Sequence, residues 1–359
     1  MDGPDAPAGR RETMTAPEDI PGPLTRAAQA YRMRWKRRRL LFRAWRKRGE
    51  LACVTPLRPV SKAAVLCLAT VRNEAARLPF WLAHHRRIGV DRFLVVDNAS
   101  DDGTRDLLAA QPDVALWETR ASYRAARFGV DWLGWLARRH AAGHWVLTLD
   151  ADELFVYPHW EERPITALAA ELDRRRQPAL GALMVELYPE GRLSGTPYRP
   201  GDDPVQALPW FDAGPYRARR QRPARNLWVQ GGPRERVFFG DDPRRAPTLN
   251  KLPLVRWRGT HAYLNSCHAL LPPRLNLAWE GPGDPRLSGA LLHTKFLNTI
   301  VQRSADPDHR AEHFGDPARF GAYHDALAAD PVLWHDRATR YEGWRQLERL
   351  GLMSSGGWT

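Results

Sequence analysis

The chain has 359 residues, 43% of them hydrophobic and 26% charged, which is enough for one large domain or two smaller ones. Its three cysteines form no CxxC pair and leave at least one thiol unpaired, which argues against a disulfide framework or a thiolate zinc site. No stretch approaches the roughly 18 uninterrupted apolar residues of a membrane span, and the N-terminus lacks a signal-peptide pattern. We therefore expect a cytoplasmic protein, with peripheral attachment to the inner face of a membrane left open.

The formal net charge of +13 comes from one segment. Eleven Lys and Arg residues and no acid lie between Arg26 and Arg48, and the rest of the chain, with 43 basic and 41 acidic residues, is close to neutral. This asymmetry localises any electrostatic attraction to a polyanion or a membrane to that segment.

Residues 1–24 are rich in Pro, Gly, Ala and acids and are predicted to form a disordered leader. Residues 25–50 are predicted to form a basic amphipathic helix, because Tyr31, Trp35, Phe42 and Trp45 fall at spacings of four, seven and three. Such a helix suits an anionic bilayer surface. The alternative is that its aromatic stripe packs on the domain, and nucleic-acid binding is a third, weaker interpretation.

Downstream, apolar runs alternate with helical patterns. Strands are predicted at 64–71, 93–96, 114–117, 145–149 and 181–187, and helices at 78–88, 104–108 and 123–140. This alternation indicates βαβ units, so the predicted fold is α/β with a mostly parallel sheet flanked by helices.

The second half is harder to assign to elements. Residues 188–260 are rich in Pro, Gly and Arg and are expected to form loops and short antiparallel strands over the sheet's C-terminal edge. We predict one large domain over residues 60–345, in which 60–190 form the nucleotide-binding half, 191–300 the acceptor half and 301–345 C-terminal helices.

Polar clusters follow three of the predicted strands: Arg72-Asn73-Glu74, Asp97-Asn98 and Asp150-Ala151-Asp152-Glu153. Ligands of open α/β sheets bind outside the carboxyl ends of the strands. Neither a G-x-G-x-x-G fingerprint nor a P-loop is present, so we expect a carboxylate-held cation, Mn²⁺ or Mg²⁺, to bind phosphates instead. In an extended segment Asp150 and Asp152 would point the same way and share one cation.

The stretch 71–157 resembles glycosyltransferase family 2, which has the GT-A fold. The resemblance is carried by Arg72-Asn73-Glu74, by the ten residues 95–104 (Val-Val-Asp-Asn-Ala-Ser-Asp-Asp-Gly-Thr) and by 149–153 (Leu-Asp-Ala-Asp-Glu). It covers about residues 63–190. Beyond them the chain is similar to a bacterial subgroup of this family, with its Asp-Ala-Asp-Glu motif, through residues 231–238, 251–257 and 292–296.

The resemblance implies a role for several residues. Asp97 would hydrogen-bond the nucleotide base, with the Arg72-Asn73 loop against it, and Asp150 and Asp152 would bind ribose and metal, Asp152 more directly. Arg124 and Arg127 are candidates for the basic residue that contacts the nucleotide; otherwise they lie on a solvated helix face. His293 is a candidate further metal ligand and Lys295 a candidate diphosphate contact, the alternative being a buried, hydrogen-bonded histidine.

Arg234 and Arg236 are candidates to neutralise the departing diphosphate. Family 2 enzymes invert at the anomeric carbon, which requires a carboxylate to accept the acceptor's proton. No clear equivalent of the family's base is present; Glu235 lies at roughly the expected separation, with Asp212 and Glu186 behind it. Trp210, Trp257 and Trp279 are candidate sugar-stacking residues.

The sequence therefore predicts an inverting, metal-dependent glycosyltransferase. It would move a sugar from a nucleotide-diphosphate sugar to a saccharide or lipid-linked acceptor, in surface polysaccharide synthesis. One alternative is a nucleotidyltransferase, which would usually have a Gly-rich basic signature after the first strand. Another is a protein that binds membrane or nucleic acid through residues 26–48; no nucleic-acid partner is expected under the main hypothesis.

Overall fold

The computed structural model describes residues 22–306 and 317–359. Its centre is a nine-stranded sheet, listed here in spatial order: β1 (Ala52–Thr55), β4 (Val114–Glu118), β3 (Arg92–Asp97), β2 (Val65–Val71), β5 (Trp145–Thr148), β11 (Asn250–Arg256), β7 (Ala179–Glu186), β14 (Gly289–His293) and β6 (Glu153–Val156). Only β1, β11 and β6 run against the direction that the other six share. The predicted class, α/β with a mostly parallel sheet flanked by helices, is confirmed.

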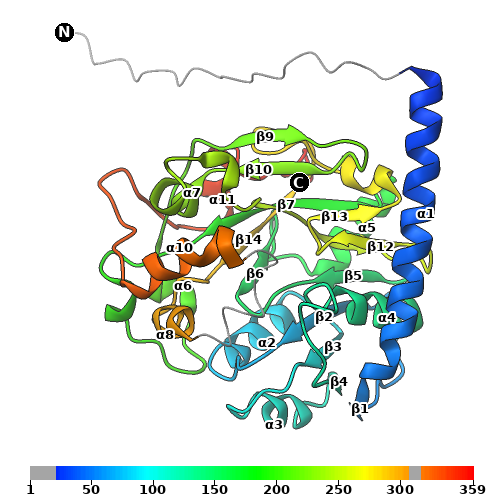
Figure 1. Ribbon diagram of the computed structural model, residues 1–359, viewed down its shortest axis with the longest axis horizontal. Helices are drawn as coiled ribbons and strands as arrows, with labels where there is room; N and C mark the ends of the chain where they lie inside the picture. Colours follow the sequence, from blue (N-terminus) through cyan, green and yellow to red (C-terminus); the bar gives the residue numbers. More distant parts are fainter. Residues whose placement is uncertain (1–21, 307–316) are drawn as a thin grey trace.

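Helices cover both faces of the sheet (Figure 1). Alternate residues of β2 point to opposite faces: Val65 and Cys67 pack with α2 (Leu78–Arg87) and α5 (Ile165–Arg174), while Leu66 and Leu68 pack with α4 (Val130–His140). The basic helix α1 (Pro23–Lys47) lies outside α4 as a further layer. The other helices are α3 (Thr104–Ala109), α6 (Pro204–Ala207), α7 (Gly232–Phe238), α8 (Thr299–Ala305), α10 (Pro317–Ala328) and α11 (Trp344–Arg349), with 3₁₀ turns η1 (Arg48–Glu50), η2 (Leu193–Gly195), η3 (Pro243–Arg245) and η4 (Pro273–Leu277).

The predicted leader, 1–24, lies outside the described residues up to residue 21, and α1 already begins at Pro23. The alternative in which the aromatic stripe of α1 packs on the domain is wrong. Met33, Leu40 and Ala44 are the buried residues of this helix, and the aromatic side chains are exposed. Over residues 22–306 and 317–359, no helix has the length and apolar character needed to span a membrane.

The helix predicted over 123–140 is shorter than expected and begins at Val130. Arg127, Phe128 and Gly129 all have positive φ angles, which end any helix that approaches from the N-terminal side. Gly129 also lies against β2, where an added Cβ would stand 2.6 Å from Thr70 Oγ1. This close approach requires glycine, and the turn it permits sends residues 121–128 toward the carboxyl ends of the strands.

The second half contributes more to the sheet than predicted. β11 inserts antiparallel between β5 and β7, and β14 pairs parallel with β7 and antiparallel with β6. The expected short antiparallel strands are present outside the sheet as β9 (Arg217–Arg220) with β10 (Leu227–Gln230), β12 (Ala262–Asn265) with β13 (Ala269–Leu271), and β8 (Trp210–Phe211) with β15 (Thr339–Arg340). The part of the main sheet from β5 to β6 is therefore assembled from both halves of the chain.

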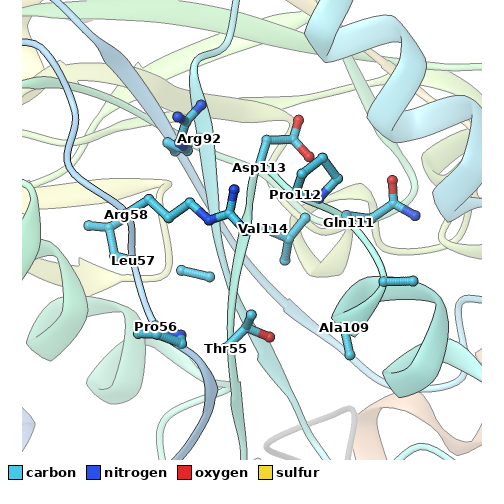
Figure 2. A pocket seen from close by; sticks show the side chains of 12 residues that line it. Thr55, Pro56, Leu57, Arg58, Arg92, Ala109, Gln111, Pro112, Asp113 and Val114 are labelled. Atoms are coloured by element: carbon cyan, nitrogen blue, oxygen red, sulfur yellow. The ribbon is translucent and has the colours of Figure 1, made fainter.

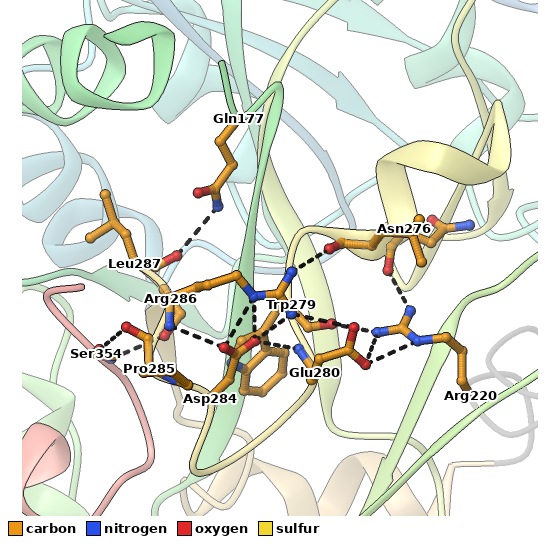
Figure 3. A network of polar contacts seen from close by, with 12 residues as sticks. Gln177, Arg220, Asn276, Trp279, Glu280, Asp284, Pro285, Arg286, Leu287 and Ser354 are labelled. Atoms are coloured by element: carbon orange, nitrogen blue, oxygen red, sulfur yellow. Dashed lines mark hydrogen bonds and ion pairs between the residues drawn. The ribbon is translucent and has the colours of Figure 1, made fainter. Parts of the chain in front are cut away.

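A polar network secures the segment that leads into β14 (Figure 3). Arg286 contacts Asp284 at 2.7 Å, and Ser354 near the C-terminus donates a hydrogen bond to the carbonyl of Pro285 at 2.9 Å. Arg220 of β9 donates to the carbonyl of Trp279 at 2.7 Å. These contacts hold residues 279–286 and therefore the start of β14, whose last residue is His293.

Gly181 of β7 gives a test of this packing. An added Cβ there would lie 2.2 Å from Cβ of Trp279, which is buried. We expect Gly181→Ala to lower the free energy of unfolding by at least about 2 kcal/mol, as overpacked core substitutions do. Gly191→Ala, where nothing lies within 4 Å, should change it by less than about 0.5 kcal/mol. Chemical denaturation measures both, and equal stabilities would contradict the packing described.

Candidate active site

The polar clusters that follow β2, β3 and β5 meet at one end of the sheet, because these strands are parallel neighbours. The loops after β2 and β3 are joined directly: the backbone N–H of Asn73 donates to Ser100 Oγ at 3.0 Å, and that of Glu74 donates to Thr104 Oγ1 at 2.8 Å. Asp97 is buried and accepts a hydrogen bond from the backbone N–H of Ser100 at 3.1 Å. The first and second clusters thus form one continuous rim.

Beside this rim, strand register builds a row of ionisable side chains across three strands. His293, the last residue of β14, is paired in register with Glu186 of β7 on one side and Glu153 of β6 on the other. Cross-strand neighbours share a face of the sheet, with Cβ atoms about 5 Å apart. All three side chains are buried. The register alone therefore places one carboxylate on each side of the His293 imidazole.

Asp152 lies at the end of this row, and we call the four residues Asp152, Glu153, Glu186 and His293 the acidic row. Its Oδ2 lies 3.2 Å from His293 Nε2, while His293 Nδ1 lies 3.4 Å from Glu186 Oε1. The backbone N–H of Thr294 donates to the carbonyl of Asp152 at 2.7 Å, which fixes the loop before β6 against the end of β14. Glu186 is also ion-paired with the buried Arg234 of α7. His293 is therefore oriented from both ring nitrogens by carboxylates.

Lys251 is the main site residue that the sequence analysis did not identify. Its ammonium group is 1% exposed and lies 2.6 Å from Asp150 Oδ2 and 2.5 Å from Glu153 Oε1. The signal that could have found it is a lone lysine at the start of the apolar run 252–255. Glu186 carries a similar signal, since it ends the predicted strand 181–187.

The geometry assumed for Asp150 and Asp152 is wrong. Residues 149–152 form a turn between β5 and β6, not an extended segment, and the carboxylate of Asp150 points to Lys251. Asp152, Glu153 and His293 instead each offer one ligand atom, and these atoms lie within 4.8 Å of one another. Asp152 and His293, two of the predicted metal ligands, thus lie together, with Glu153 beside them.

These residues fit a divalent cation. Within the described part of the chain, Glu153 Oε1, both Glu186 carboxylate oxygens and His293 Nδ1 are buried and lack a well-formed hydrogen bond. Their present partners are the ion pairs with Lys251 and Arg234, with which a cation bound at these carboxylates would compete. Two carboxylates and an imidazole are a donor set suited to Mn²⁺, and carboxylates also suit Mg²⁺.

The pKa values reflect this crowding. Burial alone would raise the pKa of Asp152, but His293, Arg77 and Lys295 hold it well below its ordinary value. Burial raises the pKa of Glu153 to about 7 despite Lys251. For His293, burial is outweighed by Asp152 and Glu186, so its pKa is raised. The carboxylates around His293 therefore favour its protonated form.

Three further groups lie within electrostatic reach of the row. Arg77 is buried at the start of α2, where it pairs with Glu74 at 2.8 Å and is influenced by Asp152. Burial and Arg234 lower the pKa of Lys295 to about 8, while Asp152 and Glu186 act to raise it. Burial and the nearby Asp150 raise the pKa of Tyr123. Arg77 and Tyr123 were not anticipated from the sequence.

Other predicted residues occupy different surroundings. Arg72 and Arg124 are exposed. Arg127 contacts Asp131 at 3.1 Å and donates to the carbonyls of Tyr263 and Leu264, so its contacts fasten α4 to β12 and do not place it in the acidic row.

The two predicted bases are held by arginines. Asp212 is bound by Arg236 at 2.9 Å, by His335 at 3.2 Å and by the hydroxyl of Tyr188. Arg236 is thus committed to Asp212 and to the carbonyl of Leu333. Glu235 Oε2 accepts from Arg217 of β9 at 2.7 Å.

The proposed sugar-stacking role of two tryptophans is wrong. Trp257 and Trp279 are 0% and 3% exposed and belong to the core, because their indoles fill the space against the sheet. Trp210 is half-buried and lies edge-on to Trp334.

A small cavity of about 180 Å³ lies elsewhere, lined by Thr55, Arg58, Arg92 and Asp113 among others (Figure 2). Arg92 and Val114 are the first residues of β3 and β4. The cavity is therefore at the opposite end of these strands from the acidic row, and it is separate from the candidate active site.

The fold and the row of carboxylates, histidine and lysine define an α/β protein with a cation-compatible site at its strand ends. No family model matches the chain. A rice protein (Oryza sativa subsp. japonica) described as a glycosyltransferase family 92 protein is 31% identical over 106 residues, which are 27% of this chain and 17% of the relative. The chain thus matches less than a fifth of that relative's length.

Two solved structures are similar in part. One is the mannosyltransferase PcManGT from Pyrobaculum calidifontis in complex with GDP-Man and Mn²⁺, with 22% identity, a TM-score of 0.26 and coverage of 45% of this chain and 44% of that one. The other is 4-diphosphocytidyl-2C-methyl-D-erythritol synthase, with 19% identity, a TM-score of 0.25 and coverage of 38% and 67%.

The raised pKa of His293 predicts how metal affinity depends on pH. A cation must displace the proton of His293, and that of Glu153 below about pH 7. Affinity for Mn²⁺ should therefore fall with falling pH, by about tenfold per pH unit for each displaced proton. Titration of Mn²⁺ by electron paramagnetic resonance at several pH values measures the slope.

In His293→Gln the slope should decrease by about one proton, in addition to weaker binding. As a control, Asp106→Asn on the exposed face of α3 should keep the wild-type slope. If the affinity of the wild-type protein for Mn²⁺ does not change with pH, then metal binding does not displace a proton from His293.

Proposed function

We propose that this protein is a divalent-metal-dependent glycosyltransferase that moves a sugar from a nucleotide-diphosphate sugar to a hydroxyl of a saccharide or lipid-linked acceptor. The observation that carries the proposal is the group Asp152, Glu153 and His293, with ligand atoms within 4.8 Å of one another. It lies at the carboxyl ends of the strands, where open α/β sheets bind nucleotides. Buried Arg77 and Arg234 and half-buried Lys295 supply positive charge to the same place.

The rice relative supports sugar transfer as the coarse activity, since it is described as a glycosyltransferase. That relative is placed in family 92, whereas the motifs at 72–74, 95–104 and 149–153 resemble family 2. Our proposal rests on what these assignments share, which is transfer from an activated sugar. The resemblance to family 2 additionally favours an inverting reaction and an acceptor in a surface polysaccharide.

The roles of the side chains follow from the charge that develops in this reaction. The bond from the anomeric carbon to the diphosphate oxygen breaks, so negative charge grows on the leaving group. A bound Mn²⁺ or Mg²⁺ supplies a Lewis acid for that charge. Lys295 and Arg234 add positive charge on the chain's own side, and Glu186 holds His293 in the orientation in which its Nε2 faces Asp152. Asp97, with the rim at 72–74, is proposed to bind the nucleotide base.

Among the candidate bases we favour Glu235. Asp212 receives Arg236, His335 and Tyr188, so its carboxylate is engaged as a buried anchor. Glu186 is fully buried between Arg234 and His293. Glu235 has Arg217 on one oxygen and lies next to Arg234 in α7, which places its backbone beside the acidic row. A base needs an oxygen available to the acceptor hydroxyl.

The central test is hydrolysis of a panel of sugar nucleotides with and without Mn²⁺, after a thermal-shift screen of nucleoside diphosphates has identified the base. We expect Asp152→Asn to lower the Mn²⁺-dependent rate by at least about a hundredfold, because it removes a ligand charge. Asp106→Asn, an exposed control on α3, should keep the wild-type rate. Equal, metal-independent rates in wild type and Asp152→Asn would refute the proposal, and release of pyrophosphate from nucleoside triphosphates would favour a nucleotidyltransferase.

A paired comparison tests the base. Glu235→Gln should lower the kcat for transfer by about a hundredfold or more while the affinity for donor nucleotide stays the same. Asp212→Asn should instead lower the free energy of unfolding by about 2 kcal/mol, because Arg236 loses the negative charge and one of the two acceptor oxygens that it contacts. Donor binding by calorimetry and thermal unfolding separate the two effects. A Glu235→Gln enzyme with unchanged kcat would exclude Glu235 as the base.

A further inference from the structure

The helix α1 is fastened to the domain along one side. Met33, Leu40 and Ala44 are buried there, and Gly134 of α4 lies under Ala44, where an added Cβ would be 3.6 Å from it. Arg43 contacts Asp131 at 2.9 Å. With 25 residues the helix is about 37 Å long. These contacts hold α1 along one side of the molecule (Figure 1).

The opposite side of α1 carries four exposed aromatic side chains, which we call the aromatic ridge. Tyr31, Trp35, Phe42 and Trp45 are 56%, 52%, 56% and 42% exposed. Because an α-helix turns about 100° per residue, Tyr31, Trp35 and Phe42 fall about half a turn away from Met33, Leu40 and Ala44. Single exposed apolar residues are ordinary, but contiguous exposed apolar patches mark interaction sites. The four rings of the ridge therefore indicate a binding surface.

Cations flank this ridge on both sides. The eleven Lys and Arg residues between 26 and 48 are accompanied by no acid. The guanidinium of Arg38 lies 5.3 Å from the centre of the Trp35 ring, and that of Arg48 lies 4.0 Å from that of Trp45. An open groove of about 890 Å³ runs beside the helix and is continuous with the ridge. It is lined by Tyr31 and Trp35, by the basic Arg32, Lys36, Arg39, Arg43 and Arg127, and by the apolar Met33, Leu40 and Pro223.

We propose that the outer side of α1 docks this protein on an anionic phospholipid bilayer, with the aromatic ridge at the level of the headgroups and the flanking cations on lipid phosphates. Trp and Tyr favour that interface, and an in-plane amphipathic helix has low overall hydrophobicity with a basic polar face. The occupant is a bilayer and not a nucleic acid, because four rings, with Arg38 stacked on Trp35 among them, form the outermost line and most of the other charges lie to either side. Binding to a duplex would place the charges at the centre of the contact.

This inference is independent of the proposed transferase activity, because α1 takes no part in the acidic row. The experiment is co-sedimentation of the full chain with vesicles of phosphatidylcholine alone and of phosphatidylcholine mixed with phosphatidylglycerol. Wild type should bind the mixed vesicles and lose most binding at high salt. Lys36→Gln/Arg39→Gln should bind about 25-fold more weakly, at about fivefold per charge. Trp35→Ser/Phe42→Ser should weaken binding by at least about tenfold.

Two surface arginines of α11 supply the matched control. Arg345→Gln/Arg349→Gln removes the same number of charges from the exposed side of another helix, and should bind vesicles as wild type does. Thermal unfolding should be unchanged in all three variants, because the substituted side chains are exposed. Failure of wild type to bind mixed vesicles, equal binding by the α1 and α11 variants, or aromatic-dependent dimerisation in place of vesicle binding would each overturn the proposal. So would tighter binding to duplex DNA than to vesicles.

Discussion

Buried carboxylates at the strand ends impose a requirement that the rest of the structure has to meet. Glu153 and Glu186 are almost fully removed from water, and a carboxylate in that position needs a cation or several hydrogen bonds. The cations that contact these two carboxylates, Lys251 and Arg234, come from the second half of the chain, and so does His293. Charge compensation therefore depends on β11, α7 and β14 lying beside β5, β6 and β7.

The sequence predicts the elements whose determinants are local. The runs at 93–96 and 145–149 are apolar because their strands are buried on both faces, and polar residues follow directly where the chain emerges. The strand-end rule then places Asp97 and Asp152 at one edge. The helix predicted over 123–140 begins later than expected. Its apolar pattern extends N-terminal to Val130, but the positive φ angles at residues 127–129 and the close approach of Gly129 to Thr70 are not visible in that pattern.

The composition of the site depended on contacts that no local pattern encodes. Glu153 joins Asp152 and His293 because β6 pairs with β14, and Lys251 reaches Asp150 across 101 residues because β11 inserts beside β5. Periodicity predicts that a segment is a strand but not which strand lies next to it. The geometric error at Asp150 has the same origin, since residues 149–152 turn in order to carry the chain from β5 to β6 at the far edge of the sheet.

The molecule uses positive charge in two physically different ways. In the row, Lys251 and Arg234 are buried against carboxylates, so their interactions are little screened and depend on geometry. A bare phosphate would have to displace these carboxylates before it could contact Lys251 or Arg234. On α1 most of the charges are exposed, and among the described residues only Arg43 and Lys47 pair with a carboxylate, so the others act over about a Debye length and without a fixed geometry. The net charge of +13 is therefore no measure of affinity for phosphates at the site; it describes the helix alone.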